Sequence, residues 1–310
     1  MELTALIGAS GALGKSIAST LSGQGKPYRV IGRTGAALRI TFGHDPLASI
    51  ATWNPDEPES VRSALDGVET AIYMVGVNYW QFELHPQLMK KTLDGAIAAG
   101  VKKLLLIGTV YGYGLPQAER VSEDHPRQPH TYKGRMRKEQ EDLVLAAHSD
   151  SLQTAILRLP DFYGPGVDKS FLWSAFQSAK NGKRAQLVGP IDTPHEFVYI
   201  PDAGKTIVQL IFEPLAWGHA WNLGGAGVTS AHAMVDEIFT QAGRKPKYTV
   251  AGKTMLRAFG LFNPMVRELV EMHYLLTSPV VLDDTRLSNL LGGLVKTPYS
   301  EGIRQTLATI

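Results

Sequence analysis

The chain has 310 residues, of which 44% are hydrophobic and 19% are charged, and its formal net charge is +2. This length suits one large domain or one domain with a second lobe, and the composition is typical of a globular protein. Charges of both signs are dispersed and form no basic run, which argues against a nucleic-acid partner. The absence of cysteine excludes disulfides, thiol catalysis and cysteine-ligated zinc.

The ends and the apolar runs of the chain bear on its location. The N-terminus enters a strand-like segment at Leu3–Ile7 without a basic and then apolar leader, so we expect no secretory signal. Runs such as Leu104–Ile107 are too short to span a bilayer, so we expect no membrane partner. The absence of disulfides fits the cytosol, so we predict a cytoplasmic protein. We expect its partner to be a small-molecule substrate, and we expect a monomer or a homodimer.

The first half alternates short apolar runs with helical patterns, which is typical of βαβ units around a parallel sheet. Strands are predicted at 3–7, 28–31, 50–53, 71–75 and 104–107, and helices at 58–65, at 88–99 and along the face Leu13, Ile17 and Leu21. In the second half, strands are predicted at 152–157 and 196–200, and helices at 171–180 and 231–242.

This pattern predicts an α/β fold, namely a doubly wound Rossmann parallel sheet with a smaller, mostly C-terminal substrate lobe. We expect residues 1–165 and about 193–225 to form an NADP-binding Rossmann domain. The substrate-binding lobe is then expected at about 166–192 and 226–310.

A glycine-rich loop, Gly8-Ala9-Ser10-Gly11-Ala12-Leu13-Gly14, follows the first strand and opens a helix. Glycine there permits a tight turn, a close approach of the backbone to a pyrophosphate, and close packing of helix on sheet. The pyrophosphate would lie at the positive end of the helix. We therefore expect the cofactor to contact Gly8, Ser10, Gly11, Ala12, Leu13 and Gly14. The alternative is a plain strand-to-helix turn.

A P-loop is a second interpretation of the same segment. Residues 9–16 approach the P-loop pattern, with Ala9 at its first glycine position. A P-loop ATPase also needs an aspartate at a strand end to help hold magnesium. The strands near Val75 and Ile107 end without one, so we disfavour this interpretation.

The residues after the second strand, Gly32-Arg33-Thr34, indicate which dinucleotide is bound. NAD-selective Rossmann proteins place Asp or Glu here, whereas an arginine accommodates the 2′-phosphate of NADP. We expect Arg33 and Thr34 to bind that phosphate, with NADP(H) as the cofactor and NAD(H) possible. An exposed loop arginine is the alternative. The other residues expected to line the cofactor site are Asn54, Val75, Gly76, Lys133, Pro160 and Phe162.

Five stretches spread over most of the chain carry a resemblance to a known family. They are Gly8–Gly14, Leu105–Gly112, Ser122–Pro126, Leu157–Gly166 and Glu196–Gly204. With them the chain resembles the extended and atypical short-chain dehydrogenase/reductases, a group that includes NAD-dependent epimerases and dehydratases. The resemblance implies a nicotinamide cofactor, and it implies that Thr109 orients a substrate oxygen.

The family's Tyr-x-x-x-Lys motif is altered in this chain. In the family, the lysine contacts the nicotinamide ribose and lowers the pKa of the tyrosine, which exchanges a proton. In one register of residues 131–141, Lys133 takes the tyrosine position and Arg137 the lysine position, while Gly134 and Glu141 match residues that accompany the motif. In the other, Tyr132 keeps its place and Met136 replaces the lysine. We favour the first register because it preserves more matches.

The altered motif changes the expected chemistry. Arginine can bond the ribose but cannot trade protons at working pH. Lys133 could act as a general acid only if burial or the charge of Arg137 lowered its pKa. Tyr111 or Tyr113 is a candidate displaced acid, although for Tyr111 we favour core or pocket packing over catalysis. A solvated helix face is the alternative for Lys133 and Arg137.

The remaining candidates are single residues. No H-E-x-x-H or tight histidine cluster is present, so we expect no metal. His195 is a candidate for the pocket wall, and Asp161 stands where relatives often carry asparagine near the nicotinamide. Aromatic residues predicted to line the substrate site are Tyr79, Trp80, Phe82, Phe171, Trp173 and Phe176.

We therefore predict an NADP(H)-dependent oxidoreductase that acts on a small or medium organic carbonyl or alcohol. One alternative is a redox-neutral epimerase or dehydratase that uses bound NAD(P). Another is a non-catalytic NADP(H)-binding sensor or scaffold with a degenerate catalytic motif.

Overall fold

The structure is a computed structural model that describes residues 2–310, the side chains of residues 264 and 265 excepted. The strands are β1 (Thr4–Ile7), β2 (Tyr28–Gly32), β3 (Ala48–Thr52), β4 (Thr70–Tyr73), β5 (Lys103–Thr109), β6 (Gln153–Leu159), β7 (Asp161–Tyr163), β8 (Ala185–Val188), β9 (Phe197–Tyr199), β10 (Ala220–Asn222) and β11 (Tyr248–Ala251).

The α-helices are α1 (Ala12–Gly23), α2 (Gly35–Phe42), α3 (Pro58–Ala64), α4 (Leu84–Ala98), α5 (Tyr132–Ala146), α6 (Trp173–Asn181), α7 (Ile200–Ile211), α8 (Ala231–Gln241), α9 (Lys253–Gly260), α10 (Pro264–Met272), α11 (Tyr274–Thr277), α12 (Thr285–Leu291) and α13 (Tyr299–Ala308). Two short 3₁₀ helices, η1 (Val110–Tyr113) and η2 (Pro214–Ala216), complete the set of described helices.

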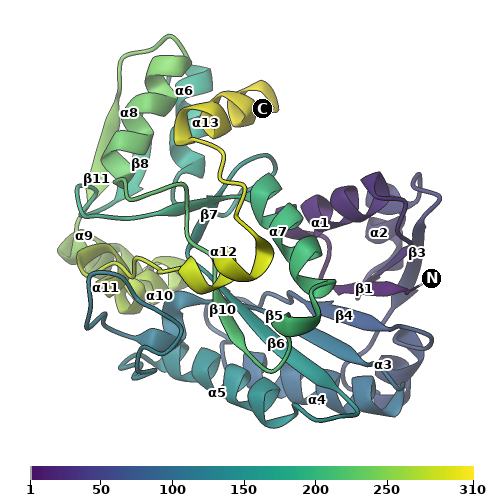
Figure 1. The fold of residues 1–310 in the computed structure, drawn as a ribbon. Coiled ribbons are helices and arrows are strands. Elements are labelled where there is room, and N and C mark those ends of the chain that lie inside the picture. The colour runs from purple at the N-terminus through teal and green to yellow at the C-terminus, as the bar shows by residue number, and fades with distance from the viewer. Residues whose placement is uncertain (1) are drawn as a thin grey trace.

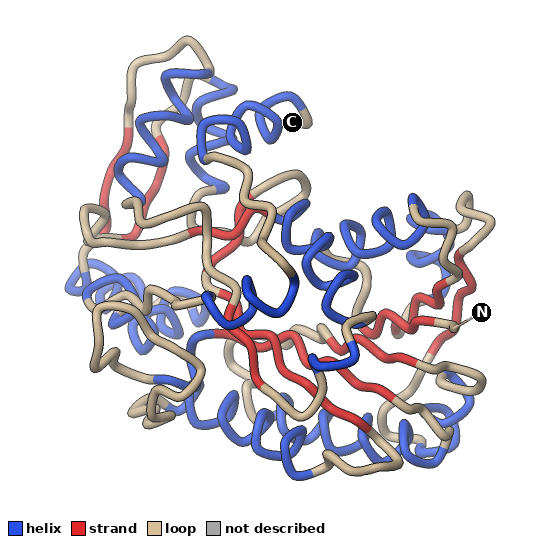
Figure 2. Tube along the Cα trace, viewed as in Figure 1, coloured by secondary structure: helices blue, strands red, loops and turns tan. Residues whose placement is uncertain are grey.

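A seven-stranded sheet in the order β10-β6-β5-β4-β1-β2-β3 forms the centre of the molecule. All of its pairings are parallel. Figure 2 shows these strands between two layers of helices. The order reverses between β1 and β4, and the loops after the carboxyl ends of these two strands flank the crevice where such sheets bind ligands. The prediction of a doubly wound Rossmann sheet is confirmed.

Each face of the sheet is covered by its own apolar cluster. Helices α1, α2 and α7 cover one face, where Ile17, Leu38 and Ile207 are buried. Helices α3, α4 and α5 cover the other, where Val61, Leu93 and Val144 are buried. Burial on both faces explains why the strands read as continuous apolar runs and not as alternating patterns.

The C-terminal lobe has a separate apolar core. Helices α6, α8 and α13 pack around the two-stranded pairs β8–β11 and β7–β9 (Figure 1). One segment expected in this lobe packs elsewhere: Leu287 of α12 is buried in the core of the main sheet, and Leu290, Leu291 and Leu294 pack against that core. Leucines at spacings of three and four form one helix face, which here covers the sheet.

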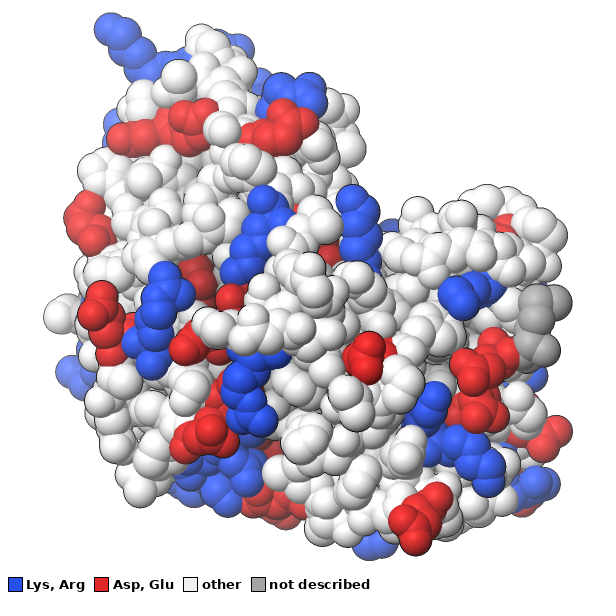
Figure 3. Space-filling model, in the orientation of Figure 1, with Lys and Arg blue, Asp and Glu red and all other residues white. Residues whose placement is uncertain are grey.

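Element boundaries differ from the predictions where local chemistry permits extension. Helix α4 begins at Leu84 and not at Leu88, because Pro86 lies in its first turn, where proline is tolerated. Helix α2 was not predicted, since its eight residues present only Leu38 and Phe42 to the core. On the face of the molecule in Figure 3, charges of both signs are interspersed.

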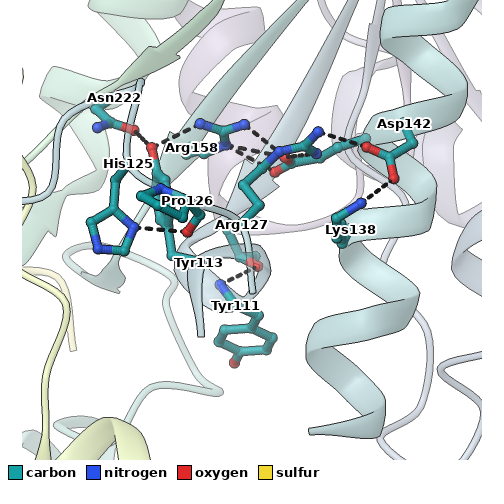
Figure 4. A network of polar contacts seen from close by, with 11 residues as sticks. Tyr111, Tyr113, His125, Pro126, Arg127, Lys138, Asp142, Arg158 and Asn222 are labelled. Carbon is teal, nitrogen blue, oxygen red and sulfur yellow. Dashed lines mark hydrogen bonds and ion pairs between the residues drawn. The ribbon is translucent and has the colours of Figure 1, made fainter. Parts of the chain in front are cut away.

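A buried ionic network ties α5 to the sheet (Figure 4). Arg158 of β6 donates through Nη2 to Glu141 of α5 at 2.8 Å and through Nη1 to the hydroxyl of Tyr113 at 2.7 Å. Both Arg158 and Glu141 are 2% exposed. Burial alone lowers the pKa of Arg158, but the charge and hydrogen bonds of Glu141 outweigh it and raise that pKa.

The network extends to β10 on one side and to the loop before α5 on the other. Tyr113 donates to Asn222 Oδ1 of β10 at 2.8 Å. Arg127 donates to Glu141 at 3.1 Å and to Asp142 at 2.6 Å. The position of α5 is therefore set by charged groups from β6 and from the loop before the helix, in addition to apolar packing.

Replacing Glu141 with glutamine should destabilise the protein by about 3–5 kcal/mol, because the change leaves Arg158 charged and unpaired in the interior. Urea denaturation of the two proteins measures the difference in free energy of unfolding. Glu59→Gln is the matched control, since Glu59 pairs with Arg62 on an exposed face and should change stability little. Equal stabilities for Glu141→Gln and wild type would contradict the role of the network.

Candidate active site

The glycine loop after β1 packs closely against the residues that follow β4. Gly8 has φ of +86°, and a Cβ there would lie 3.0 Å from the backbone of Val75. A Cβ on Gly14 would overlap the carbonyl oxygen of Ala9. Each glycine therefore permits a close approach that a side chain would block. Gly76 and Ser10 are exposed beside this loop.

Helix α1 begins at this loop with free backbone donors. Its N-cap residue is Gly11, and no side chain caps the first turn. The first N–H groups of a helix have no partner within the helix, so they are available to an anion. Gly166 approaches the same turn, since a Cβ on it would lie 3.7 Å from the Cβ of Ala12. Phe162 and Leu13 pack against one apolar cluster, which brings the stretch after Pro160 beside the loop.

Two basic side chains follow β2. Arg33 comes directly after the strand and is exposed, and its neighbour Thr34 is the N-cap of α2 without a side-chain cap bond. Arg39 lies in α2, with Nη1 3.4 Å from the position of a Cβ on Gly35. Neither arginine side chain has a hydrogen bond or ion pair within residues 2–310. Arg39 was not among the predicted site residues.

Asn54, also predicted to contact the cofactor, has local partners. Its Nδ2 donates to Glu57 at 2.8 Å, and its Oδ1 accepts from the backbone N–H of Asp56 at 3.1 Å. Asn54 therefore shapes the turn after β3, and its side chain is engaged there.

Thr109 and two tyrosines gather at the end of β5. The Thr109 hydroxyl accepts a bond from the backbone N–H of Tyr111 at 3.3 Å, so its hydrogen remains available to another acceptor. The hydroxyls of Tyr111 and Tyr79 are 3.3 Å apart. Burial raises the pKa of both phenols, which moves them away from proton exchange near neutral pH.

The side chains of α5 favour the register in which Arg137 replaces the family's lysine. Lys133 is buried and Tyr132 is 44% exposed, so it is Lys133 that faces the site. Arg137 Nη1 donates to Gln140 Oε1 at 2.8 Å, and the guanidinium lies 5.8 Å from the centre of the Phe82 ring. Arg137 Nε, Gln140 Nε2 and the Tyr73 hydroxyl are buried without a partner in the described chain. These atoms form a polar group with unmet hydrogen bonds.

Lys133 is held by two glutamates that the sequence analysis did not single out. Its Nζ donates to Glu271 Oε2 at 2.6 Å and also to Glu268, both on α10. Its backbone N–H donates to Glu271 Oε1 at 3.0 Å. Burial alone lowers the pKa of Lys133, but the two carboxylates outweigh it and raise that pKa. Lys133 could act as a general acid only with a lowered pKa, and its pKa is raised instead, so that condition is not met.

Asp161 and His195 form a pair on the other side of the site. Asp161 Oδ2 lies 2.9 Å from His195 Nε2. Strands β7 and β9 place Asp161 beside Phe197, two residues after His195. Asp161 follows two residues after Leu159, which pairs with Thr109, so the segment that carries this carboxylate runs beside the end of β5.

The predicted aromatic lining divides between core and site. Phe82 and Phe176 are buried, and Trp173 packs against the core of the C-terminal lobe. Trp80 is 53% exposed. Tyr79 joins Tyr111, and Phe171 lines a hollow in the C-terminal lobe together with His195.

A family model described as the NAD dependent epimerase/dehydratase family matches residues 5–224. This chain belongs to that family. The match spans more than half of the chain and confirms the resemblance inferred from the five stretches. Members of the NAD dependent epimerase/dehydratase family are enzymes. Comparison with curated proteins gave no match.

Solved structures share the whole fold. The dTDP-glucose 4,6-dehydratase of Bacillus anthracis, in complex with NAD, is 14% identical with a TM-score of 0.81, and the alignment covers 100% of this chain and 96% of that one. The enzyme WbmH of Bordetella bronchiseptica, in complex with NAD+, is 17% identical with a TM-score of 0.79 and coverages of 100% and 98%. The UDP-glucose 4-epimerase of Thermotoga maritima, with UDP-glucose, is 16% identical with a TM-score of 0.79 and coverages of 99% and 98%.

Two searches of the described residues bear on other kinds of site. No group of three or more histidine and acidic side chains among them could hold a metal ion. No helix within residues 2–310 has both the length and the apolarity needed to cross a membrane.

A buried histidine beside Arg137 should make stability depend on pH. Burial, and then the charge of Arg137, lower the pKa of His85 from 6.5 to about 2. Below pH 6.5 the unfolded chain binds a proton at this residue that the folded chain does not, so stability falls as the pH falls. We expect His85 to lower the free energy of unfolding by about 2 kcal/mol between pH 7 and pH 5.

Denaturant titrations of wild type and His85→Leu at both pH values measure this contribution. The difference between the proteins at pH 7 reports the change in packing, and the change in that difference at pH 5 reports the proton. A His85→Leu variant that loses as much stability as wild type on acidification would refute the assignment.

Proposed function

We propose that this protein is an NADP(H)-dependent oxidoreductase that acts on a small or medium carbonyl or alcohol. This proposal is carried by the segment after β2, where Arg33 and, in α2, Arg39 have no side-chain partner among residues 2–310 and residues 32–34 contain no acid. Rossmann proteins that select NAD use an acidic residue at this point for the ribose 2′-hydroxyl, whereas arginine accommodates a 2′-phosphate. Two of the related structures named above contain NAD, so the proposed preference for NADP rests on these two arginines alone.

The residues around the crevice fit a dinucleotide. The uncapped first turn of α1 and the close approach of Gly8 to Val75 suit a pyrophosphate. Arg137 Nε and Gln140 Nε2 are buried donors without partners in the described chain, so this turn of α5 has unmet hydrogen-bonding capacity. Arg137, in the register favoured above, would hold the nicotinamide ribose as the family's lysine does. The cofactor supplies hydride chemistry when it is bound.

The proposed roles of the other residues follow from their contacts. Thr109 would donate its free hydroxyl hydrogen to the substrate oxygen, with the Tyr111 and Tyr79 hydroxyls beside it. Lys133 would hold α10 over α5 through Glu271 and Glu268, and would not serve as a proton donor. A redox-neutral epimerase or dehydratase cycle would use the same cofactor contacts.

A non-catalytic NADP(H)-binding protein is the second candidate. One observation favours it: the residue at the family's tyrosine position is a lysine whose Nζ is engaged by two carboxylates. Cofactor binding and turnover must therefore be tested separately.

Replacing Arg33 or Arg39 with alanine should weaken NADPH binding about ten- to a hundredfold, because each change removes a charge-assisted contact with the 2′-phosphate. Calorimetric titration with NADPH and NADH measures both affinities. The affinity for NADH should change little, and Arg304→Ala on α13 serves as the control on a distant exposed surface. Wild-type protein that prefers NADH would remove both arginines from the site.

Oxidation of NADPH with a panel of carbonyl compounds tests catalysis. Thr109→Val should lower the rate about a hundredfold or more, because it removes a hydroxyl aimed at the reacting oxygen while keeping the side-chain shape. Thr109→Ser, which keeps the hydroxyl, should retain activity. NADPH binding without turnover across aldehydes, ketones and sugars would support the non-catalytic candidate.

A further inference from the structure

A hollow in the C-terminal lobe lies beside the candidate active site. The empty space within and above it, including space open to solvent, is about 400 Å³. Its walls come from α6 and the loop before it, β8, the 190–195 loop, β9 and α11. Its apolar lining includes Phe171, Leu187, Ile191, Phe197 and Leu276.

The hollow has an uncharged wall with few polar side chains. None of the residues that line it is a lysine, arginine, aspartate or glutamate. The polar side chains of the lining are Thr193 and His195. The Thr193 hydroxyl donates to the backbone carbonyl of Leu276 at 2.7 Å, so its hydrogen is already engaged. His195 is therefore the side chain best placed to recognise a polar group inside the hollow.

His195 is held rigidly. Its backbone N–H and C=O each bond to Thr229 at 2.7 Å. Its Nε2 is paired with Asp161 at 2.9 Å, and its ring packs on Phe197 with centroids 4.7 Å apart. Nδ1 has no hydrogen-bond partner within the described residues 2–310. Because Nε2 donates its hydrogen to Asp161, Nδ1 of the neutral ring is an acceptor and can receive a hydrogen bond from a ligand hydroxyl. Side chains fixed in this way bind without a large loss of entropy.

The Asp161–His195 pair lies between the hollow and the end of β5. His195 lines the hollow, and Asp161 follows two residues after Leu159, which pairs with Thr109 of β5. A ligand that bonds His195 would therefore have its polar end on the side of the hollow nearest the end of β5.

We propose that this hollow binds an uncharged, mainly apolar alcohol whose hydroxyl donates a hydrogen bond to His195 Nδ1. This rests on the proposed oxidoreductase function and names its substrate class. The diphosphate of a nucleotide-sugar carries charges that proteins bind with arginine, lysine or backbone N–H groups. Among these apolar walls such charges would be buried without a cation, which is costly.

Four probes test the substrate class on the full chain without cofactor: acetophenone, 1-phenylethanol, ethylbenzene and UDP-glucose. Ligand-observed NMR titration gives the affinity of each. 1-Phenylethanol, which can donate a hydrogen bond to Nδ1, should bind more tightly than acetophenone and ethylbenzene, and UDP-glucose more weakly than any of the three. UDP-glucose as the tightest ligand would overturn the proposal.

Two variants test the residues. His195→Phe should weaken 1-phenylethanol about three- to tenfold, the contribution of one hydrogen bond, and leave ethylbenzene unchanged. Leu187→Arg adds a cation to the wall and should weaken all three neutral probes. Leu215→Arg is its matched control, since Leu215 is 72% exposed on η2, outside the hollow lining. An unchanged ratio of 1-phenylethanol to ethylbenzene affinity in His195→Phe would overturn the role of His195.

Titration of the same preparations with NADPH separates this inference from the proposed function. NADPH binding by every variant shows that each is folded. Cofactor binding without binding of the neutral probes would refute the hollow as the substrate site and leave the cofactor proposal standing. Binding of the probes without NADPH would do the reverse.

Discussion

The buried ion pair between Glu141 and Arg158 is the interaction on which the site depends. It joins α5 to β6, and through Tyr113 and Asn222 it also ties η1 and β10 to the same point. Arg137 lies one turn before Glu141 on α5, so the pair sets where its guanidinium lies relative to the end of β5. Any shift of α5 along the sheet would separate Glu141 from Arg158 and leave a charge unpaired in the interior, which is costly. The pair therefore fixes the position of α5 on the sheet.

Lys133 is an electrostatic anchor for α10. Its Nζ bonds Glu268 and Glu271, which lie 135 and 138 positions later in the chain. Its backbone N–H also donates to Glu271, so α10 lies against the N-terminal turn of α5. In the register favoured above, this anchor stands at the position of the family's tyrosine, and a side chain held by two carboxylates would not take over the proton exchange.

Two halves of the site differ in character. The half formed by the first turn of α1 and the end of β2 presents backbone donors and arginines, which suit a phosphorylated cofactor. The hollow of the C-terminal lobe presents apolar side chains and one histidine. Asp161 lies where the halves meet, paired with His195 and two residues after Leu159, the partner of Thr109 in the sheet. This division separates charge recognition from recognition of shape and apolar surface.

The sequence alone determined the parallel sheet, the cofactor loop and the family, because apolar periodicity, glycine spacing and short motifs are local properties. It also showed that the Tyr-x-x-x-Lys motif is altered. Only the tertiary structure decided that Lys133 meets Glu268 and Glu271, that Asp161 meets His195, and that α12 returns to the main core. These contacts join residues between 34 and 138 positions apart. Pairings at that range depend on how helices and strands pack, which no local pattern encodes.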